Sequence, residues 1–214
     1  MGRSDDWARL SSEISSCVKC RLSESRSKAV PGEGSLNAKL MFIGEAPGRS
    51  EDEVGRPFVG AAGKLLTQLL EVNSIKREEV FITNVVKCRP PENREPLEDE
   101  IMSCAPFTNS IIQLIQPSII VTLGSYSGRY VLEDLGGLRW YGVTRMRGKV
   151  YSINLFGRST TVVPTYHPAA ALYNPSPRAA LEEDFKLIAS KYREVLQSEV
   201  RTGGRRRTLL DYVG

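Results

Sequence analysis

The sequence contains one histidine, His167, in the stretch TYHPAAAL at residues 165–172. An imidazole held against Pro168 after an apolar run suits a hydrogen-bonding or acid–base group at the edge of a cleft. Polar side chains follow other apolar runs: Glu45 lies in GEAPG, and Asn84 and Asn93 lie in NVVKCRPPENR. Each of them alone also suits a loop cap, a turn or a strand-end residue that satisfies backbone groups. Together they favour a shared ligand-binding or catalytic cleft.

Four cysteines form the second group with chemical potential. Cys17 and Cys20 form a CxxC pair, and Cys88 and Cys104 flank a proline-rich segment. The CxxC pair is a chelating arrangement, whereas the spacing of the second pair is too wide for an ordinary zinc finger. Structural disulfides are disfavoured inside cells, and Cys104 alone also fits the apolar face of a helix. An all-thiolate site is the simplest account of the set, and zinc and a [4Fe–4S] cluster both satisfy it.

Alternating strands and helices are predicted to position these residues. The apolar runs typical of strands are 40–43, 80–86, 119–123, 150–155 and 161–164. Helical periodicity covers about 63–71, about 97–116, and a long segment after Ser176-Pro177. This alternation indicates an α/β fold with a largely parallel sheet. Because the carboxyl ends of parallel strands share one edge, we expect His167, Glu45, Asn84 and Asn93 to converge there.

Composition limits the broad class of protein. A chain of 214 residues with 41% hydrophobic content is long enough for one α/β domain with a proper core. The apolar runs are too short to span a bilayer and the first residues are polar, so we expect a cytoplasmic protein that does not enter a membrane. The formal net charge is +4, but residues 199–214 hold four Arg against two acids. The overall charge is therefore little evidence for nucleic acid.

Four stretches and one later cysteine, Cys104, resemble one known family, and the stretches are GEAPGRSED, GRPFVGAAGKLL, NVVKCRPPENR and YHPAAAL. Together they closely resemble the family 4 uracil-DNA glycosylases, the iron–sulfur enzymes of archaea and thermophilic bacteria, over about residues 10–195. The GLAPA variant typical of family 5 is absent. The resemblance implies a three-layer α/β/α domain with a central, mostly parallel, four-stranded sheet, and it favours a [4Fe–4S] cluster on Cys17, Cys20, Cys88 and Cys104.

The resemblance also implies how uracil is held. His167 would hydrogen-bond uracil O2 and stabilise the departing uracil anion. The Asn84 amide would distinguish uracil from cytosine, because cytosine presents the opposite donor and acceptor pattern. Phe58 would stack on the flipped base, and Glu51 would exclude the 5-methyl group of thymine. The backbone around Gly44 and Ala46 would complete the base site.

Roles in water activation and DNA binding follow from the same resemblance. Glu45 and Asn93 are both expected to orient the attacking water. Ser125, Pro168 and the backbone amides of Gly48 and Gly63 are candidate phosphate contacts. Leu172 or Tyr173 would wedge into the space that the flipped base leaves. The expected substrate is uracil-containing DNA, and the expected product is free uracil with an abasic site.

The chain divides into a glycosylase domain at residues 1–198 and a basic, flexible tail at 199–214. Part of the tail, Arg206–Val213, resembles the short motif by which archaeal repair proteins bind the sliding clamp, although Arg206 replaces the usual Gln. A tail that only touches DNA is the alternative. We expect a monomer. Two other classes fit less well: a non-catalytic metal-stapled nucleic-acid module, and a hydrolase with GEAPG as a phosphate cradle.

Overall fold

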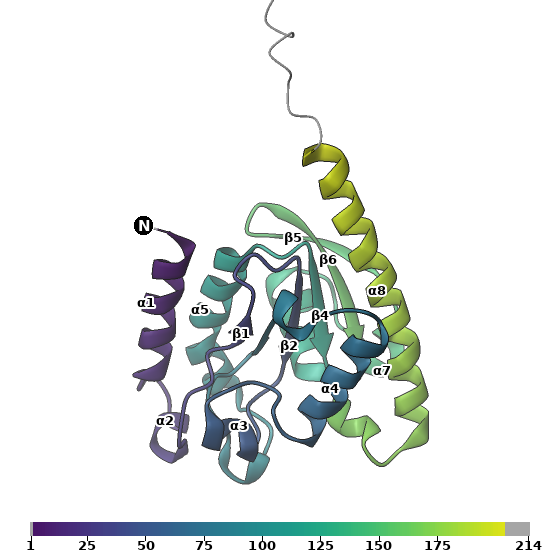
Figure 1. Ribbon diagram of the computed structural model, residues 1–214. Coiled ribbons are helices and arrows are strands. Elements are labelled where there is room, and N and C mark those ends of the chain that lie inside the picture. Colours follow the sequence, from purple (N-terminus) through teal and green to yellow (C-terminus); the bar gives the residue numbers. More distant parts are fainter. Residues whose placement is uncertain (1, 204–214) are drawn as a thin grey trace, which may run out of the picture.

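A computed structural model of the chain describes residues 2–203, and these residues form an α/β fold around one sheet (Figure 1). The six strands lie in the order β1-β3-β2-β4-β6-β5. The strands β3, β2, β4 and β6 are parallel, and β1 and β5 pair antiparallel at the two edges. Their bounds are β1 Glu33–Gly34, β2 Leu40–Gly44, β3 Phe81–Asn84, β4 Ile119–Leu123, β5 Tyr151–Leu155 and β6 Arg158–Thr165.

The expected α/β class and mostly parallel sheet are confirmed, but the sheet is wider than the four strands expected. The four parallel strands correspond to four of the predicted apolar runs, and the fifth run is the edge strand β5. The additional strand β1 has only two residues, which is too short to produce an alternating pattern in the sequence. The strand β6 begins at Arg158 rather than 161, because its first residues pair with β5 in a hairpin.

The central strands are apolar on both faces because helices cover both faces of the sheet. All residues of β2 and all residues of β4 are buried. Met41 and Ile43 belong to one core cluster with α5, whereas Leu40 and Phe42 belong to a second cluster with α4 and α8. This alternation follows from the two-residue period of a strand, and it accounts for the three-layer arrangement.

In Figure 1, α1 and α5 lie on one side of the sheet, and α4 and α8 lie on the other. The ring of Phe185 in α8 stacks on Phe42 of β2 with 5.8 Å between ring centroids. The α-helices are α1 Arg3–Ser15, α2 Leu22–Ser25, α3 Arg49–Val54, α4 Ala61–Val72, α5 Glu98–Ile115, α6 Ser125–Arg129, α7 Val143–Met146 and α8 Pro175–Gly203. Shorter turns are η1 Arg77–Glu79, η2 Pro91–Asn93, the π-helical η3 Tyr130–Leu135, and η4 Pro168–Ala171.

The last helix extends further than the sequence suggests. The segment expected to be a flexible tail starts at residue 199, but α8 continues to Gly203. The clamp-like segment Arg206–Val213 lies outside the described residues. No helix within residues 2–203 has both the length and the apolar character that crossing a bilayer requires.

Candidate active site

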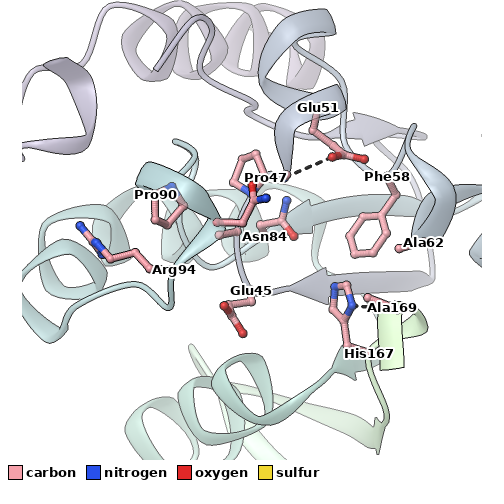
Figure 2. Close-up of a pocket in the computed structure, with 13 residues that line it drawn as sticks. Glu45, Pro47, Glu51, Phe58, Ala62, Asn84, Pro90, Arg94, His167 and Ala169 are labelled. Carbon is pink, nitrogen blue, oxygen red and sulfur yellow. Dashed lines mark hydrogen bonds between the residues drawn. The ribbon is translucent and has the colours of Figure 1, made fainter. Parts of the chain in front are cut away.

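A pocket with a volume of about 320 Å³ opens at the carboxyl edge of the sheet. Its walls come from the segments that follow β2, β3 and β6, together with the Phe58 loop before α4 (Figure 2). Eight of the residues singled out from the sequence lie in its lining: Glu45, Ala46, Gly48, Glu51, Phe58, Asn84, Asn93 and His167. The expected convergence of polar strand-end residues is therefore present as geometry, because parallel strands bring their carboxyl ends to one edge.

Asn84 is the last residue of β3 and is 1% exposed. Its side-chain Oδ1 is buried and has no hydrogen-bond partner among the described residues. A buried polar atom without a partner costs about 1–3 kcal/mol, so such atoms are rare in folded proteins unless a ligand pairs with them. Because Asn84 lines the pocket, this oxygen is available to accept a hydrogen bond from a bound molecule.

Phe58 forms a wall of the same pocket through an unusual backbone conformation. Its φ is 51°, in the left-handed region that a bulky residue seldom adopts. Two glycines permit this placement. A Cβ on Gly44 would lie 2.6 Å from Phe58 Cζ and would also collide with Asn84 Oδ1, and a Cβ on Gly63 would collide with the Phe58 carbonyl. Gly44 thus leaves room for both the aromatic ring and the amide.

Glu51 connects the loops that carry these side chains. One of its carboxylate oxygens accepts hydrogen bonds from the backbone N–H groups of Val59 and Gly60, both at 2.8 Å. The other accepts from the Gly48 N–H at 3.1 Å, as drawn in Figure 2. The side chain therefore fixes the Phe58 loop to the start of α3, and the Gly48 amide is already paired.

His167 has a defined orientation, and in Figure 2 the Phe58 ring lies between it and Glu51. Its Nδ1 accepts a hydrogen bond from the Ala169 N–H at 3.1 Å, so in the neutral ring the proton resides on Nε2. Burial lowers the pKa of His167 to about 4, although the nearby Glu51 carboxylate acts in the opposite direction. The ring centroid lies 5.6 Å from that of Phe58. Near pH 7, His167 is thus a neutral donor beside an aromatic wall.

Glu45 follows β2 and lies partly buried in the pocket. Burial and, to a smaller extent, the negative charge of Glu95 together raise the pKa of Glu45 to about 7. Glu95 Oε2 in turn accepts a hydrogen bond from the Tyr126 hydroxyl at 2.6 Å. Near neutral pH, Glu45 is therefore close to the midpoint of its titration, which suits a general base.

Asn93 also lines the pocket, from the proline-rich segment after β3. Its Oδ1 accepts a hydrogen bond from Arg89 Nε at 2.7 Å. The residue has φ 55°, and the preceding Glu92 has the same φ. Two consecutive residues in the left-handed region form a tight turn that presents the Asn93 side chain at the pocket.

Of the residues expected to contact DNA, Gly48 lies in the pocket lining, whereas Ser125, Pro168, Leu172 and Tyr173 lie outside it. Ser125 is exposed at the first turn of α6, and Pro168 is buried at the start of η4. Leu172 packs partly against the core on the α4 and α8 side, whereas Tyr173 is 93% exposed. Of the two candidate wedge residues, Tyr173 is thus the one whose side chain is free of core packing.

The pocket also contains residues that the sequence did not single out. These residues are Pro47, Ala62, Pro90, Arg94 and Ala169. Arg94 donates to both carboxylate oxygens of Glu100 at 2.9 and 2.6 Å, and Glu100 has no exposed surface. Arg94 belongs to the quoted stretch NVVKCRPPENR, so its position in that motif was the available signal. No sequence signal indicated the hydrogen bond between Glu95 and Tyr126, because the two residues are far apart in the chain.

The four cysteines line a second cavity, between α1, α5 and the segment after β3. None of the four forms a disulfide. Hydrogen-bond donors point at three of the sulfurs: the Lys19 N–H at Cys17, Arg26 Nη1 at Cys88 (3.0 Å), and the Lys87 N–H at Cys104 (3.3 Å). Burial raises the pKa of Cys104 to about 11 and also raises that of Cys88.

Lys87 connects the cysteine cavity with the first pocket. Its side chain is fully buried, and Nζ donates to Thr83 Oγ1 at 2.9 Å and to the backbone carbonyl of Asn84. Its own backbone N–H is the donor to Cys104. The cysteine cavity therefore holds the segment that follows Asn84, and any group that rigidifies the cavity also rigidifies the end of β3.

A polar pocket at the carboxyl edge of a largely parallel sheet is the usual place of the ligand site in α/β enzymes. The family model described as uracil DNA glycosylase superfamily matches residues 31–190. The chain belongs to this superfamily, and within it to the type-4 uracil-DNA glycosylases.

Relatives in three organisms support this assignment. A type-4 uracil-DNA glycosylase of Sulfurisphaera tokodaii is 54% identical over 86% of this chain and 84% of its own length. One of Archaeoglobus fulgidus is 42% identical over 98% of both chains. A type-5 uracil-DNA glycosylase of Pyrobaculum aerophilum is 32% identical over 66% of this chain and 66% of its own length. The type-4 matches are both higher in identity and longer.

Proposed function

We propose that the chain excises uracil from DNA by flipping the nucleotide into the pocket of Asn84, Phe58 and His167. The unpaired Asn84 Oδ1 is the observation that carries this proposal. It would accept the uracil N3–H while the same amide donates to O4. Cytosine has an acceptor at N3 and a donor at N4, so it would leave both amide groups mismatched. Phe58 provides the ring on which the flipped base stacks.

His167 then acts on the leaving group. Cleavage of the N-glycosidic bond places negative charge on uracil, largely on O2, and positive charge on the sugar. The Nε2–H of neutral His167 would donate a hydrogen bond to O2. This hydrogen bond would strengthen as the negative charge on O2 develops. The hydrogen bond from Ala169 to Nδ1 supports this role, since it fixes both the tautomer and the direction of the ring.

Glu45 is the proposed base or orienting group for the attacking water, and Asn93 assists it. The raised pKa of Glu45 supports this role. A carboxylate with a pKa near 7 accepts a proton readily, and it is still largely ionised above pH 7. In its ionised form it also offsets the positive charge on the sugar. The product is free uracil and an abasic site.

The pH dependence of this step gives a first prediction. Because Glu45 acts in its ionised form, the rate of excision should rise with pH around 7. Glu95→Gln removes a neighbouring negative charge but can still accept the Tyr126 hydrogen bond, so the Glu45 pKa should fall and the half-maximal rate should move to lower pH. Burial is the larger cause of the shift, so the displacement should be less than about one pH unit.

The measurement is the pH profile of single-turnover excision for the wild type and the variant. Glu92→Gln is the matched control, because Glu92 is an exposed carboxylate in the same segment and does not act on Glu45. A profile that does not move in Glu95→Gln, or that moves equally in both variants, contradicts the assigned electrostatics.

Glu51 is proposed to exclude thymine. With O2 at His167 and N3 and O4 at Asn84, C5 would lie across the ring from O2 and would point away from His167, toward the side of the pocket that Glu51 lines. Its carboxylate is held by three backbone hydrogen bonds, so it cannot easily retreat from a 5-methyl group. The backbone at Gly44 and Ala46 closes the base site from the side of β2.

The cysteines Cys17, Cys20, Cys88 and Cys104 are proposed to bind a [4Fe–4S] cluster. Three N–H groups directed at sulfur suit thiolates bound to a cluster. Within residues 2–203, no group of three or more Cys, His, Asp or Glu residues qualifies as a site for a single metal ion. A cluster binds each thiolate through a different iron, which suits a wider arrangement than mononuclear zinc. When bound, the cluster would serve as a structural cross-link between α1, α5 and the segment after Asn84.

If this proposal is right, protein purified without oxygen should be brown and should contain about four iron atoms per chain. Cys104→Ala should lose iron and visible absorbance and should lower the thermal midpoint, since the cross-link between α5 and Lys87 is lost. Ser103→Ala is the matched control, because Ser103 lines the same cavity without a thiol. Stoichiometric zinc in place of iron, or a Cys104→Ala variant with unchanged iron and stability, contradicts the assignment.

Contacts to DNA beyond the base are also proposals. Tyr173 is the favoured wedge because of its exposure, and Leu172 is the alternative. Ser125 and the η4 turn at Pro168 flank the pocket from β4 and β6 and are proposed to contact phosphates. The chain is proposed to act as a monomer, and Arg206–Val213 to contact a sliding clamp.

The test of the overall function is incubation with a uracil-containing oligonucleotide. Free uracil should appear, and the DNA should break only after alkali treatment, since a glycosyl hydrolase leaves the strand intact. Binding without release of uracil would instead favour a non-catalytic nucleic-acid module.

A further inference from the structure

One long segment of the chain carries positive charge and no negative charge. Residues 135–181 contain six Lys or Arg and no Asp or Glu, although the whole chain has 25 acidic residues. The segment includes β5, β6, η4 and His167. A surface that faces phosphates must avoid carboxylates, so this segment is where contact with DNA beyond the base site is electrostatically favoured.

This segment contains a shallow hollow of about 440 Å³ that is lined by Arg139, Tyr141, Arg145 and Lys149. We call these four residues the Tyr141 surface. All four are exposed. None of the three cations forms an ion pair with a carboxylate in the described part of the chain. By contrast, the neighbouring Arg147 is paired with Asp184 at 2.5 Å.

The cations of the Tyr141 surface are held in place by local contacts. The guanidinium carbons of Arg139 and Arg145 lie 5.4 and 4.9 Å from the centroid of the Tyr141 ring. Lys149 Nζ donates to the Arg145 carbonyl at 3.1 Å. Cation–π contacts order the two arginines without neutralising them. The positive charges are therefore gathered and oriented before any ligand binds.

The Tyr141 surface lies at the same edge of the sheet as the base pocket. The Gly148 N–H donates to the Pro164 carbonyl at 3.0 Å, one residue before β6 ends. Arg147 lies over the ring of Tyr166, the residue before His167, at 5.6 Å. These two contacts place the segment that carries Arg145 and Lys149 beside the end of β6, from which the chain continues to His167.

We propose that the Tyr141 surface is a second DNA-binding site, which binds phosphates of the strand that flanks the flipped nucleotide. This inference rests on the proposed function, since DNA is the ligand in both. The two sites differ in what they contribute. The Tyr141 surface adds affinity for DNA that depends on strand length and salt, and it contributes nothing to the chemical step. Tyr141 is a positioning residue that holds Arg139 and Arg145.

The experiment compares two variants with equal change in charge. The first carries Arg139→Gln, Arg145→Gln and Lys149→Gln. The control carries Arg158→Gln, Lys186→Gln and Arg193→Gln, which remove exposed cations at the start of β6 and on α8. Arg158 belongs to the acid-free segment, but it lies at the opposite end of β6 from His167. Affinity is measured by fluorescence anisotropy over a range of salt concentrations. The ligands are long and short oligonucleotides, with and without uracil, and the short ones have one nucleotide on each side of the uracil position.

For the first variant, we expect affinity for the long oligonucleotides to fall about tenfold or more, and the slope of log K against log salt to fall by about 2 to 3. Affinity for the short oligonucleotides and the single-turnover rate at saturating enzyme should match the wild type. The control should behave like the wild type throughout. Equal losses in the two variants, or unchanged binding of long DNA, would overturn the proposal.

Two measurements keep these outcomes distinct. A variant with Arg139→Lys and Arg145→Lys retains both positive charges, so its slope of log K against log salt should match the wild type. A reduced slope in this variant would show that positive charge does not account for the binding. Binding to uracil-free DNA does not require catalysis. If the wild type fails to release uracil, the proposed function fails, while the comparison on uracil-free DNA still decides whether the Tyr141 surface binds the strand.

Discussion

His167→Ala should lower the single-turnover rate of uracil excision by about 10²–10³-fold, because removal of one oriented donor to a developing anion costs this much in comparable sites. Binding of uracil-containing DNA should change much less, since the hydrogen bond to O2 strengthens mainly as the bond to the sugar breaks. The measurement is single-turnover kinetics with enzyme in excess, together with a binding curve for the same oligonucleotide.

His167→Gln provides the matched comparison for this prediction. A glutamine amide retains an N–H donor but lacks the fixed direction that the Ala169 hydrogen bond gives to the ring. Its rate should lie between those of the wild type and His167→Ala. If His167→Ala excises uracil at the wild-type rate, or if it loses affinity and rate in equal measure, the proposed leaving-group role is wrong.

Asn84→Asp should reduce uracil excision by about 10³-fold or more, the scale on which sites with buried polar groups reject a mismatched partner. At neutral pH an aspartate offers only acceptors, so one of its oxygens would face uracil O4 without a proton between them. Burial favours the protonated acid, which presents a donor to cytosine N3 and an acceptor to its amino group. A low level of cytosine release should therefore appear.

Asn84→Ala separates a change in specificity from simple damage to the pocket. Alanine removes both hydrogen-bonding groups, so uracil excision should fall without any release of cytosine. The assay is chromatographic detection of free bases from matched oligonucleotides. Wild-type activity in Asn84→Asp, or the same base preference in both variants, would contradict recognition by this amide.

The sequence predicts the parts of the fold that depend on local pattern. Continuous apolar runs indicated the four parallel strands, because strands covered on both faces need no polar side. The position of Glu45, Asn84 and His167 at one edge followed from that topology alone. The two-residue strand β1 carried no such pattern, and the extension of β6 to Arg158 depends on its pairing with β5.

Electrostatic detail could not be predicted, since it depends on contacts between distant residues. The raised pKa of Glu45 reflects burial and Glu95, which is 50 residues away in the chain. The hydrogen bonds of Glu51 to Val59 and Gly60 exist only because the Phe58 loop folds back over α3. The tautomer of His167 likewise depends on the η4 turn that brings the Ala169 N–H to Nδ1.

The most direct test of the account is the set of bases that the wild-type chain releases. Matched oligonucleotides would carry uracil, thymine or cytosine at one position, and free bases would be quantified by mass spectrometry. The buried, unpaired Asn84 Oδ1 and the fixed Glu51 carboxylate predict release of uracil alone, with an intact strand that breaks only in alkali. Release of thymine or cytosine at a rate comparable to that of uracil, or no release of uracil, would contradict the account.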